Sequence, residues 1–441
     1  MKASEVSKLI EKENVKDIAL QFSDISGILH SLWIPSELFS KAAEEGVHTD
    51  GSSVAMVDIS KSDLKLVPDP DTLAVLPPNL FPQKTARVMS DIFEPESTKP
   101  FELDPRFILK KVMNEAKKTF GASVKYNACS EIEFFLFKKT DCGIQLLDEG
   151  EYLATPPADL GAELRLEVTE NLRNMGILVE KHHHEVPHGK YEFNLAYSDA
   201  LTMADTTYLI KFLLKLTAAK RGLIASFMPK PFQGQYGCGL HTHVSLTEDK
   251  KAKNLFYNPK RSNGLSEVAL NFIAGLLAHA KSLAALTNPS VNSYKRLVPG
   301  WEAPVYISWA KYNRSVLVRV PPGRQMRTRL EYRPTDGSCN FYVAFAGILA
   351  AGLDGVKRKM ELEESVEENI YEMDARQREK RGIGLLPGNL GEALAELSKD
   401  KVLQDALGHA FYEKFVEIKT REWRDFNTTV HEWERKKYLD V

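Results

Sequence analysis

The strongest constraint on the fold is a set of three short runs in which polar and apolar residues alternate. The runs are "SEIEFFLF" (130–137), "GLHTHVSL" (239–246) and "TRLEYR" (328–333). Successive side chains of a β-strand point to opposite faces of its sheet, so each run collects its charged and polar residues on one face. If the runs lie in one antiparallel sheet, its apolar face packs on helices and its polar face lines a cavity.

The polar face of these runs predicts a metal and phosphate site. Clustered carboxylates repel one another unless a cation neutralises them, and Mg²⁺ or Mn²⁺ suits a set rich in carboxylates better than zinc does. Nearby arginines would bind phosphate oxygens in pairs of hydrogen bonds. The face carries these residues: Glu131, Glu133, His241, His243, Ser245, Arg329, Glu331 and Arg333.

Each run alone is more typical of a solvated sheet face than of a site. Two features favour a site. Phe134, Phe135 and Phe137 indicate burial near both faces of the first run, and the glycine-rich segment "FMPKPFQGQYGCGLHTH" precedes the histidine pair. Glycine lets the backbone approach a ligand closely.

A histidine-rich stretch, "EKHHHEVPHGKYEFNL" (180–195), raises the question of whether histidines bind the metal. Neighbouring residues on an extended chain point to opposite faces, so His182, His183 and His184 cannot all converge on one ion. We expect at most one of them to do more than pack or hydrogen-bond. The carboxylates of Glu185 and Glu192 are the better candidates for a hard metal.

Composition narrows the class of protein. Among 441 residues, 58 Lys and Arg stand against 60 Asp and Glu, a net charge of −2 that predicts neither a nucleic-acid partner nor an anionic membrane. The cysteines form no CxxC pair, which favours reduced thiols in a cytoplasmic protein. The N-terminus lacks the apolar run of a signal peptide, and the apolar stretch 341–356 is shorter than the roughly 20 residues of a membrane span. The four cysteines are Cys129, Cys142, Cys238 and Cys339.

The order of patterns predicts an α+β chain of two domains. Short strand-like pieces between turn residues occupy 17–95, and the proline-rich segment 94–107 marks a boundary, which gives domains 1–100 and 101–441. No phosphate-binding loop or dinucleotide glycine motif is found, so a nucleotide site needs another design. Helical periodicity is expected over 105–120, 161–175, 202–221, 264–286, 341–365 and 391–435.

Six ordered segments resemble the signatures of class I glutamine synthetase. The resemblance runs essentially end to end and implies a β-grasp-like N-terminal domain, a catalytic domain on a curved antiparallel sheet with flanking helices, and a dodecamer of two hexameric rings with sites shared between subunits. The segments are "DGSS" (50–53), "SEIEFFLF", "HHEV" with "GKYE", "FMPKP" with "GCGLHTH", "SYKRLVPGWEAPVYISWAKYNRS" (293–315), and "TRLEYR" with "AAGLDG" (350–355).

The resemblance also implies roles for individual residues. Two or more Mg²⁺ or Mn²⁺ ions per site would be held by one set of Glu133, Glu185 and Glu192 and another of Glu131, His241 and Glu331. ATP would contact His243, Ser245, Arg319 and Arg329, and Arg314 would act on the transferring phosphoryl group. Glutamate would bind Arg296, Arg333, Gly237 and Tyr236, and the flap carboxylate Glu302 would close over the intermediate. Ammonium would bind Asp50, Ser53, Tyr152 and Glu185, with Asp50 accepting its proton.

The implied reaction is the ATP-dependent ligation of ammonia to the γ-carboxylate of L-glutamate through γ-glutamyl phosphate. Tyr236-Gly237-Cys238-Gly239 departs from the usual Asn-Gly-Ser-Gly, and Gly189-Lys190-Tyr191-Glu192 departs from Gly-Gln-His/Asn-Glu. The bulky Tyr236 keeps an alternative open, a γ-glutamyl-amine or polyamine ligase. A catalytically dead sensor would be expected to lack a metal ligand, and none is missing.

Overall fold

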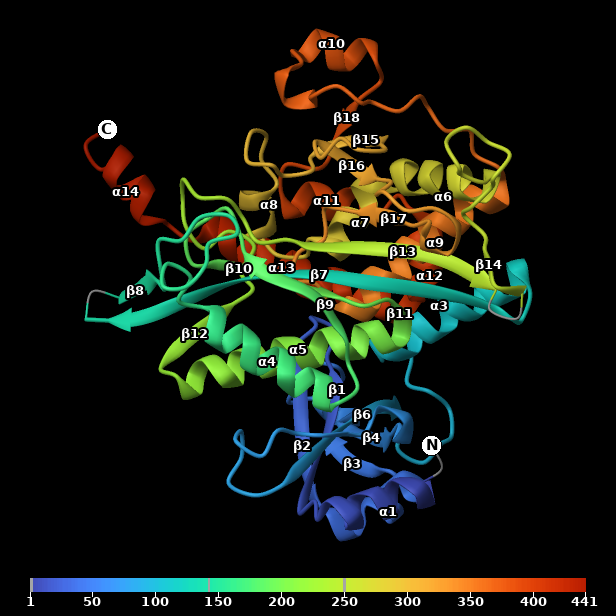
Figure 1. Ribbon diagram of the computed structural model, residues 1–441, viewed down its shortest axis with the longest axis vertical. Helices are drawn as coiled ribbons and strands as arrows, with labels where there is room; N and C mark the ends of the chain where they lie inside the picture. Colours follow the sequence, from blue (N-terminus) through green and yellow to red (C-terminus); the bar gives the residue numbers. More distant parts are fainter. Residues whose placement is uncertain (1–2, 142, 249–250) are drawn as a thin grey trace.

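The computed structural model describes residues 3–141, 143–248 and 251–441, so Cys142 lies outside the described residues. Figure 1 shows an N-terminal unit in blue packed below a larger unit, with α5 and the long strand β7 above it. The small unit is built on a sheet with strand order β2-β1-β6-β4-β3, in which β5 also pairs with β6. Its elements are α1 (Ala3–Glu13), β1 (Asp17–Ser23), β2 (Leu29–Pro35), η1 (Ser36–Leu38), α2 (Phe39–Glu45), β3 (Val47–Asp50), η2 (Ile59–Lys61), β4 (Asp63–Pro68), η3 (Pro70–Thr72), β5 (Ala74–Val75) and β6 (Thr85–Phe93).

The small unit closes its own core between the sheet and two helices. Val6 and Ile10 of α1 and Phe39 of α2 pack against Ile18 and Leu20 of β1. The sheet is mixed, because β1 pairs with β6 in parallel and with β2 in antiparallel fashion. The strand pieces expected from sequence correspond to β1, β4, β5 and β6, whereas β2 and β3 were not anticipated.

The larger unit is built on a second sheet, with strand order β18-β15-β16-β17-β13-β7-β10-β9 and short strands at its sides. Its strands are β7 (Val124–Thr140), β8 (Gly143–Leu146), β9 (Val179–His184), β10 (Lys190–Leu195), β11 (Ser198–Asp199), β12 (Leu223–Ser226), β13 (Leu240–Glu248), β14 (Lys253–Asn254), β15 (Tyr306–Ala310), β16 (Val316–Arg319), β17 (Leu330–Tyr332) and β18 (Gly384–Leu385). Pairing is antiparallel except between β15 and β16. The three alternating runs therefore lie in one sheet, on neighbouring strands β7, β13 and β17.

The alternation along β7 gives its two faces different surroundings. Ile132, Phe134 and Leu136 belong to the main hydrophobic core. Phe135 and Phe137 point the other way and form a separate apolar cluster with Cys238. The three phenylalanines are thus buried on both faces, as the sequence predicted, and the second cluster lies on the same face as Glu131 and Glu133.

Helices complete the larger unit, and most of them pack on the apolar side of this sheet. They are α3 (Pro105–Phe120), α4 (Ala162–Asn174), α5 (Ala200–Lys220), α6 (Glu267–Ala278), α7 (Ala280–Thr287), α8 (Ser293–Arg296), α9 (Phe341–Arg358), α10 (Ala375–Lys380), α11 (Leu390–Leu397), α12 (Lys401–Leu407), α13 (His409–Thr428) and α14 (Glu432–Tyr438), with short helices η5 (Gln325–Arg327) and η6 (Ile370–Glu372). Figure 1 shows α10 and α14 projecting from the body of the molecule. The remaining described cysteines, Cys129, Cys238 and Cys339, are free and buried.

Three expected helices end earlier or break. The 264–286 pattern forms α6 and α7, which meet at His279 with a bend of 75°. The 341–365 pattern ends at Arg358, where Lys359 adopts a left-handed conformation. The 391–435 pattern forms α11 to α14, and Gly408, with φ of 85°, separates α12 from α13. Apolar periodicity continues across these points because α6 and α7, and likewise α11, α12 and α13, pack on the same core.

Helices α6 and α9 cross closely because glycines line their contact. A Cβ at Gly275 would clash with the carbonyl oxygen of Ala351, and one at Gly355 would clash with that of Asn271. The apolar stretch 341–356 is therefore the start of a buried core helix. No single helix in the described ranges is long and apolar enough to cross a membrane, although the bent pair α6 and α7 passes that test by length and composition.

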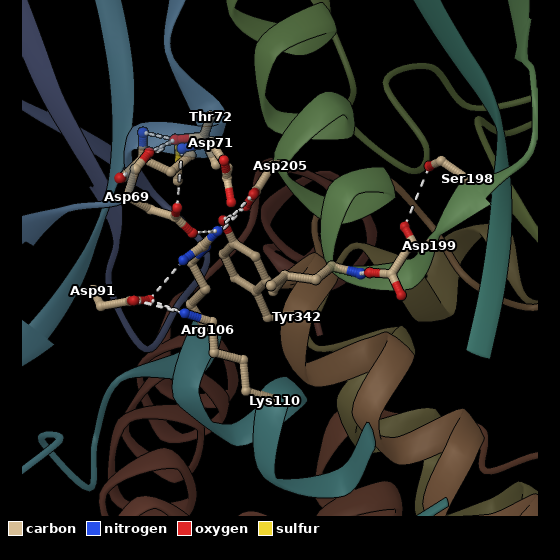
Figure 2. A network of polar contacts seen from close by, with 12 residues as sticks. Asp69, Asp71, Thr72, Asp91, Arg106, Lys110, Ser198, Asp199, Asp205 and Tyr342 are labelled. Atoms are coloured by element: carbon tan, nitrogen blue, oxygen red, sulfur yellow. Dashed lines mark hydrogen bonds and ion pairs between the residues drawn. The ribbon is translucent and has the colours of Figure 1, made fainter. Parts of the chain in front are cut away.

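A buried ion cluster joins the two units (Figure 2). Arg106, near the start of α3, donates to both oxygens of Asp205 on α5, at 3.1 and 2.9 Å. It also donates to Asp91 and Asp69 of the small unit, at 2.6 and 2.8 Å, and Tyr342 of α9 donates to Asp205. We call Arg106, Asp69, Asp91, Asp205 and Tyr342 the Arg106 cluster. The segment after β6 is thus tied to both units, and the predicted boundary at residue 100 remains a prediction.

Candidate active site

The polar face of the large sheet opens into a cavity of about 970 Å³. Strands β7, β10, β9, β13 and β16 and the loops around residues 236, 301 and 323 supply its walls. Sixteen residues expected from the sequence line it: Glu131, Glu133, Tyr152, Glu185, Glu192, Tyr236, Gly237, His241, His243, Ser245, Arg296, Glu302, Arg314, Arg319, Arg329 and Arg333. Glu331 is fully buried and contacts the lining through His241, Arg319 and Arg333.

One set of potential metal ligands is formed by Glu131, His241 and Glu331, whose ligand atoms all lie within 4.8 Å of one another. His241 Nδ1 is 3.2 Å from Glu131 Oε2 and 3.8 Å from Glu331 Oε1. Strand pairing explains the convergence, because His241 lies opposite Glu131 across β13 and β7, while Glu331 on β17 lies opposite His243. One imidazole and two carboxylates fit Mn²⁺ or Mg²⁺.

The charges around this set depress the pKa values of its carboxylates. Burial opposes ionisation of Glu331, but Arg333 and the two histidines lower its pKa to about 2. Arg319 Nε donates to Glu331 Oε2 at 2.6 Å, and Arg333 donates to Glu331 Oε1 at 2.8 Å. Burial also opposes ionisation of Glu131, whose pKa is nevertheless lowered by His243 and His241. Both carboxylates are therefore ionised and able to bind a cation.

Glu133 is placed differently from the other carboxylates. Its Oε2 atom is 2.7 Å from the ammonium nitrogen of Lys190 and also accepts from the backbone N–H of Gly239. Burial opposes ionisation of Glu133, but Lys190 and His241 lower its pKa to about 2. Within the described residues, Glu133 joins neither group of converging metal ligands.

A second converging group consists of His183, Glu185 and Glu192. His183 Nε2 is 3.4 Å from Glu192 Oε1, and His183 Nδ1 is 3.7 Å from Glu185 Oε1. The hydrogen bond to Glu192 raises the pKa of His183. Burial raises the pKa of Glu185, and Glu133 and Glu192 add to the rise although Lys190 opposes it.

The other histidines of the run have structural partners. His182 Nδ1 hydrogen-bonds to Arg165, and His184 Nε2 is 2.9 Å from Asp148, which also accepts from Tyr191. Of the three adjacent histidines, His183 alone belongs to a converging ligand group within the described residues. The expectation that at most one of them does more than pack or hydrogen-bond remains a prediction, with His183 as the candidate.

Arginines form the wall of the cavity beyond the first ligand set. Arg329 Nε donates to His243 Nδ1 at 3.3 Å, and His243 Nε2 lies 2.9 Å from Glu131 Oε1. Arg296 donates to the backbone carbonyls of Pro334 and Arg333. The Nε atom of Arg333 is buried without a hydrogen-bond partner among the described residues. This wall offers guanidinium groups to an anionic ligand.

Aromatic side chains form the rim beside the arginines. The rings of Tyr236 and Trp301 meet edge to face at 5.7 Å, and the ammonium of Lys230 lies 4.5 Å from the Trp301 ring centroid. Glu302, the next residue, has a φ of 52°, an uncommon left-handed conformation for a charged side chain. Tyr236 therefore meets the cavity as the sequence predicted, and its ring is held by a neighbour.

Two expected ammonium ligands do not line this cavity. Asp50 ends β3 in the small unit, where its carboxylate accepts from the hydroxyls of Ser52 and Ser53 at 2.6 and 2.7 Å. These hydrogen bonds lower the pKa of Asp50 to about 2. Tyr152 and Glu185 do line the cavity. The expected ammonium pocket is thus divided between two separate surfaces of one chain.

Comparison with known proteins assigns the family. The sequence matches the beta-Grasp domain of glutamine synthetase over residues 14–95 and the catalytic domain of glutamine synthetase over residues 102–438. The chain belongs to the glutamine synthetase family. The glutamine synthetase of Thermotoga maritima is 46% identical over 98% of both chains, and that of Methanocaldococcus jannaschii is 45% identical over 100% of this chain and 98% of the relative.

Solved structures of similar proteins have the same fold as this chain. The structure of apo GmaS is 32% identical with a TM-score of 0.86, and each chain covers 99% of the other. Glutamine synthetase of Plasmodium falciparum, at 24% identity, has a TM-score of 0.87 over 99% of both chains and supports the fold alone. The expected α+β class, with a β-grasp domain and a catalytic domain on a sheet flanked by helices, is confirmed.

Two residues that line the cavity of this glutamine synthetase family member, Lys190 and Asn194, are not among the site residues expected from the sequence. The comparison of motifs marks Lys190 only as a departure from the family pattern and assigns no role to Asn194. Both share a face of β10 with Glu192, because residues 190, 192 and 194 alternate with the core residues Tyr191, Phe193 and Leu195. The period-two pattern of "KYEFNL" contained that signal.

Proposed function

We propose that this protein is an ATP-dependent ligase that joins ammonia to the γ-carboxylate of L-glutamate and releases L-glutamine, ADP and phosphate. The observation that carries the proposal is one cavity in which a cation-binding group of Glu131, His241 and Glu331 adjoins a wall of arginines. The full-length similarity to curated glutamine synthetases, at 42–46% identity, supports the same reaction.

The chemistry requires that arrangement. A carboxylate resists attack by an amine because it is resonance-stabilised and negatively charged, so phosphorylation by ATP must first create an acyl phosphate with a good leaving group. A divalent metal supplies charge neutralisation on the phosphate oxygens. In our proposal, Arg319, Arg329 and His243 bind ATP phosphates together with Ser245, and Arg314 neutralises the phosphoryl group in transfer.

The amino-acid end of the cavity would hold glutamate and its activated form. Arg296 and Arg333 would bind the carboxylates of glutamate beside Gly237 and Tyr236, and the unpartnered Nε of Arg333 is a donor available for this purpose. Glu302 would shield the acyl phosphate from water. Mg²⁺ or Mn²⁺ would bind to Glu131, His241 and Glu331, and a second ion would bind to Glu133, Glu185 and Glu192, which line the same cavity.

We infer that the site is completed by a second copy of the chain. Asp50 and Ser53 lie in the small unit and do not line the cavity of their own chain, whereas Tyr152 and Glu185 do. An Asp50 from a neighbouring subunit would bind ammonium and accept its proton, and a dodecamer of two hexameric rings is the assembly that the resemblance implies. Such shared sites arise at heterologous contacts in closed rings.

Complementation tests the shared site. Asp50→Ala and Glu331→Ala variants should each be inactive, and their mixture should regain part of the activity after subunit exchange, because some contacts then pair two intact halves. Exchange is checked with differently tagged subunits. Mixed assemblies without any recovery would place Asp50 in the site of its own chain or outside catalysis.

The reaction itself is tested by following phosphate release from ATP with glutamate and a panel of amines, with products identified by mass spectrometry. We expect ammonia to give glutamine with the highest kcat/KM. Tyr236 favours one alternative, a γ-glutamyl-amine ligase, because its phenol ring adds apolar surface at the rim. A larger kcat/KM for an alkylamine or polyamine than for ammonia would select that alternative.

A further inference from the structure

Glu302 lies in an exposed turn at the rim of the cavity, within residues 299–303, which we call the flap. Gly300 and Glu302 both have a positive φ, 88° and 52°, so the backbone of the flap turns sharply before and at the carboxylate. Ala303, the last residue of the flap, is only 3% exposed. The flap can therefore be anchored at its buried end.

The carbonyl oxygen of Ala303 accepts two hydrogen bonds. One comes from the backbone N–H of Val305, two residues away, at 2.9 Å. The other comes from the hydroxyl of Tyr371 on η6, at 3.0 Å, although Tyr371 lies 68 residues further along the chain. The ring of Tyr371 also packs against that of Tyr306 on β15, with centroids 5.8 Å apart. A side chain from a distant segment thus holds the backbone next to Glu302.

The segment that carries this tyrosine, residues 366–371, is fixed to a second loop of the cavity, and we call it the brace. Asn313 Nδ2 donates to two backbone carbonyls of the brace, at 2.9 and 2.6 Å. Ser315 Oγ accepts from the backbone N–H of Ile370 at 3.1 Å. Asn313 and Ser315 flank Arg314, which lines the cavity. The brace therefore connects the loop of Arg314 to the flap.

Arg314 and Glu302 would act at successive steps of the proposed reaction, and both line the cavity. Arg314 would neutralise the phosphoryl group in transfer, and Glu302 would then shield the acyl phosphate that results. Closing a site over a reactive intermediate prevents its hydrolysis, but only while the closing loop stays in place. A fixed connection between the two loops keeps the shield where the acyl phosphate forms.

We propose that Tyr371 is a positioning residue for this reaction, because its hydroxyl holds the flap through the carbonyl of Ala303 and so directs the acyl phosphate to ammonia instead of water. The inference rests on the proposed function, since the flap has an acyl phosphate to shield only in that reaction. When the flap is loose, water attacks γ-glutamyl phosphate and releases glutamate and phosphate. Each such event consumes one ATP and forms no glutamine.

The first test compares the phosphate released with the glutamine formed. Tyr371→Phe removes the hydroxyl and keeps the ring that packs on Tyr306. The unmodified protein should release one phosphate per glutamine. In the variant, phosphate release with glutamate but without ammonia should rise about two- to tenfold, the effect of one neutral hydrogen bond, and the ratio at limiting ammonia should exceed one. A general loss of folded enzyme would lower both products together and leave the ratio unchanged.

A matched control uses the neighbouring ring. Tyr306→Phe makes the same chemical change in the side chain that packs against Tyr371, and should keep the ratio at one. The second test is hydrogen exchange of the flap peptide in the ligand-free assembled protein, followed by mass spectrometry. Exchange should be about two- to tenfold faster in Tyr371→Phe and unchanged in the control. Gel filtration establishes that both variants are assembled.

The two measurements separate this inference from the proposed function, because hydrogen exchange needs neither ATP nor glutamate. Unchanged flap exchange in Tyr371→Phe would overturn the inference whatever the ratio, since the hydroxyl would then not hold the flap. Faster exchange with a ratio that stays at one would also overturn it. An unmodified protein that forms no glutamine would overturn the function, and flap exchange would still decide whether Tyr371 anchors the flap.

Discussion

Two buried charge clusters in this molecule are built on opposite plans. In the Arg106 cluster, one guanidinium with 2% exposure contacts three aspartates, and Tyr342 donates to one of them (Figure 2). In the cavity, like charges face one another: Glu185 lies near Glu133 and Glu192, and burial raises its pKa. Polar atoms of Arg333 and Asn194 are buried there without partners among the described residues.

The difference separates charges that hold the fold together from charges that await a ligand. Removing one partner from a cluster that is complete within the chain leaves uncompensated buried charge and should lower stability. Removing one carboxylate from a group that repels itself should cost activity and leave the stability of the metal-free protein intact or improved. Four predictions follow from this contrast, from the largest expected effect to the smallest.

The largest effect is expected for Glu185→Gln in the cavity, because burial and the neighbouring Glu133 and Glu192 raise the pKa of this carboxyl. Loss of a metal ligand should lower the rate of glutamine formation about 1000- to 10,000-fold, because a bound metal contributes several kcal/mol to transition-state stabilisation. The melting temperature in chelator should stay the same or rise. Glu248→Gln, near the end of β13 and outside the cavity, is the control and should keep full activity. If this variant lost as much stability as an Arg106 variant, the cavity carboxylates would stabilise the fold just as the Arg106 cluster does, and the proposed contrast between the two clusters would be wrong.

Arg106→Met tests the other cluster. Without the guanidinium, three aspartates lose their shared cation, and the free energy of unfolding should fall by about 3–5 kcal/mol. Urea unfolding at fixed protein concentration measures it. Lys110→Met removes a partly exposed cation that pairs with Asp91, and should cost at most about 1 kcal/mol. Equal losses for the two variants would mean that the Arg106 cluster is no more than a set of surface pairs.

Tyr236→Asn tests the aromatic rim of the cavity. The phenol hydroxyl has one donor hydrogen, whereas an amide has two donor hydrogens and a separate acceptor oxygen, and one hydrogen bond to a charged substrate contributes about 1.5–3 kcal/mol. We expect the KM for glutamate to fall about tenfold with little change in kcat. Tyr236→Phe, which keeps the ring, should not lower KM. An unchanged KM in the Asn variant would mean that Tyr236 does not limit glutamate binding.

The smallest effect concerns His279, at the bend between α6 and α7. Its ring nitrogens lie 2.7 Å from Asp400 Oδ2 and 3.0 Å from Asp354 Oδ2. Burial opposes the charged ring, but the two carboxylates raise its pKa. The resulting stabilisation is fully present below the ordinary histidine pKa of about 6.5 and is lost as pH rises through the raised value.

We therefore expect His279→Asn to be less stable than the unmodified protein at pH 6 by a few tenths to about 1 kcal/mol, with a smaller difference at pH 9. Thermal unfolding at both pH values measures it. His409→Asn, at an exposed residue that pairs with Glu413, should leave stability nearly unchanged at either pH. A stability difference that does not depend on pH would assign His279 a packing role instead.

The sequence predicted the faces of the strands but not the partners across them. Period-two alternation was enough to place Glu131, His241 and Glu331 on one polar face, because that alternation is local to each strand. Which residues lie opposite one another depends on register, which turns and distant packing set. The pairing of Glu133 with Lys190, and of Glu192 with His183, therefore required the structure.

Helix lengths show the same division between local and distant causes. The pattern at 105–120 predicted α3 to the residue, because Asp104 caps its N-terminus and Gly121 ends it. The bend at His279 has no such local signal, and the partners of His279 there, Asp354 and Asp400, lie far along the chain. The place of Asp50 outside the cavity is also a matter of how the two units pack, which no local pattern reports.

The register of β10 links the packing of the core to the presence of polar side chains in the cavity. Lys190, Glu192 and Asn194 meet the cavity only when Tyr191, Phe193 and Leu195 meet the core. A strand displaced by one residue would bury two charges and expose two aromatic rings, an error that no compact molecule could tolerate. The register that buries the core residues of β10 is therefore the same register that places its polar residues in the cavity. Along this strand, a molecule with a correctly packed core also has its reactive groups in place.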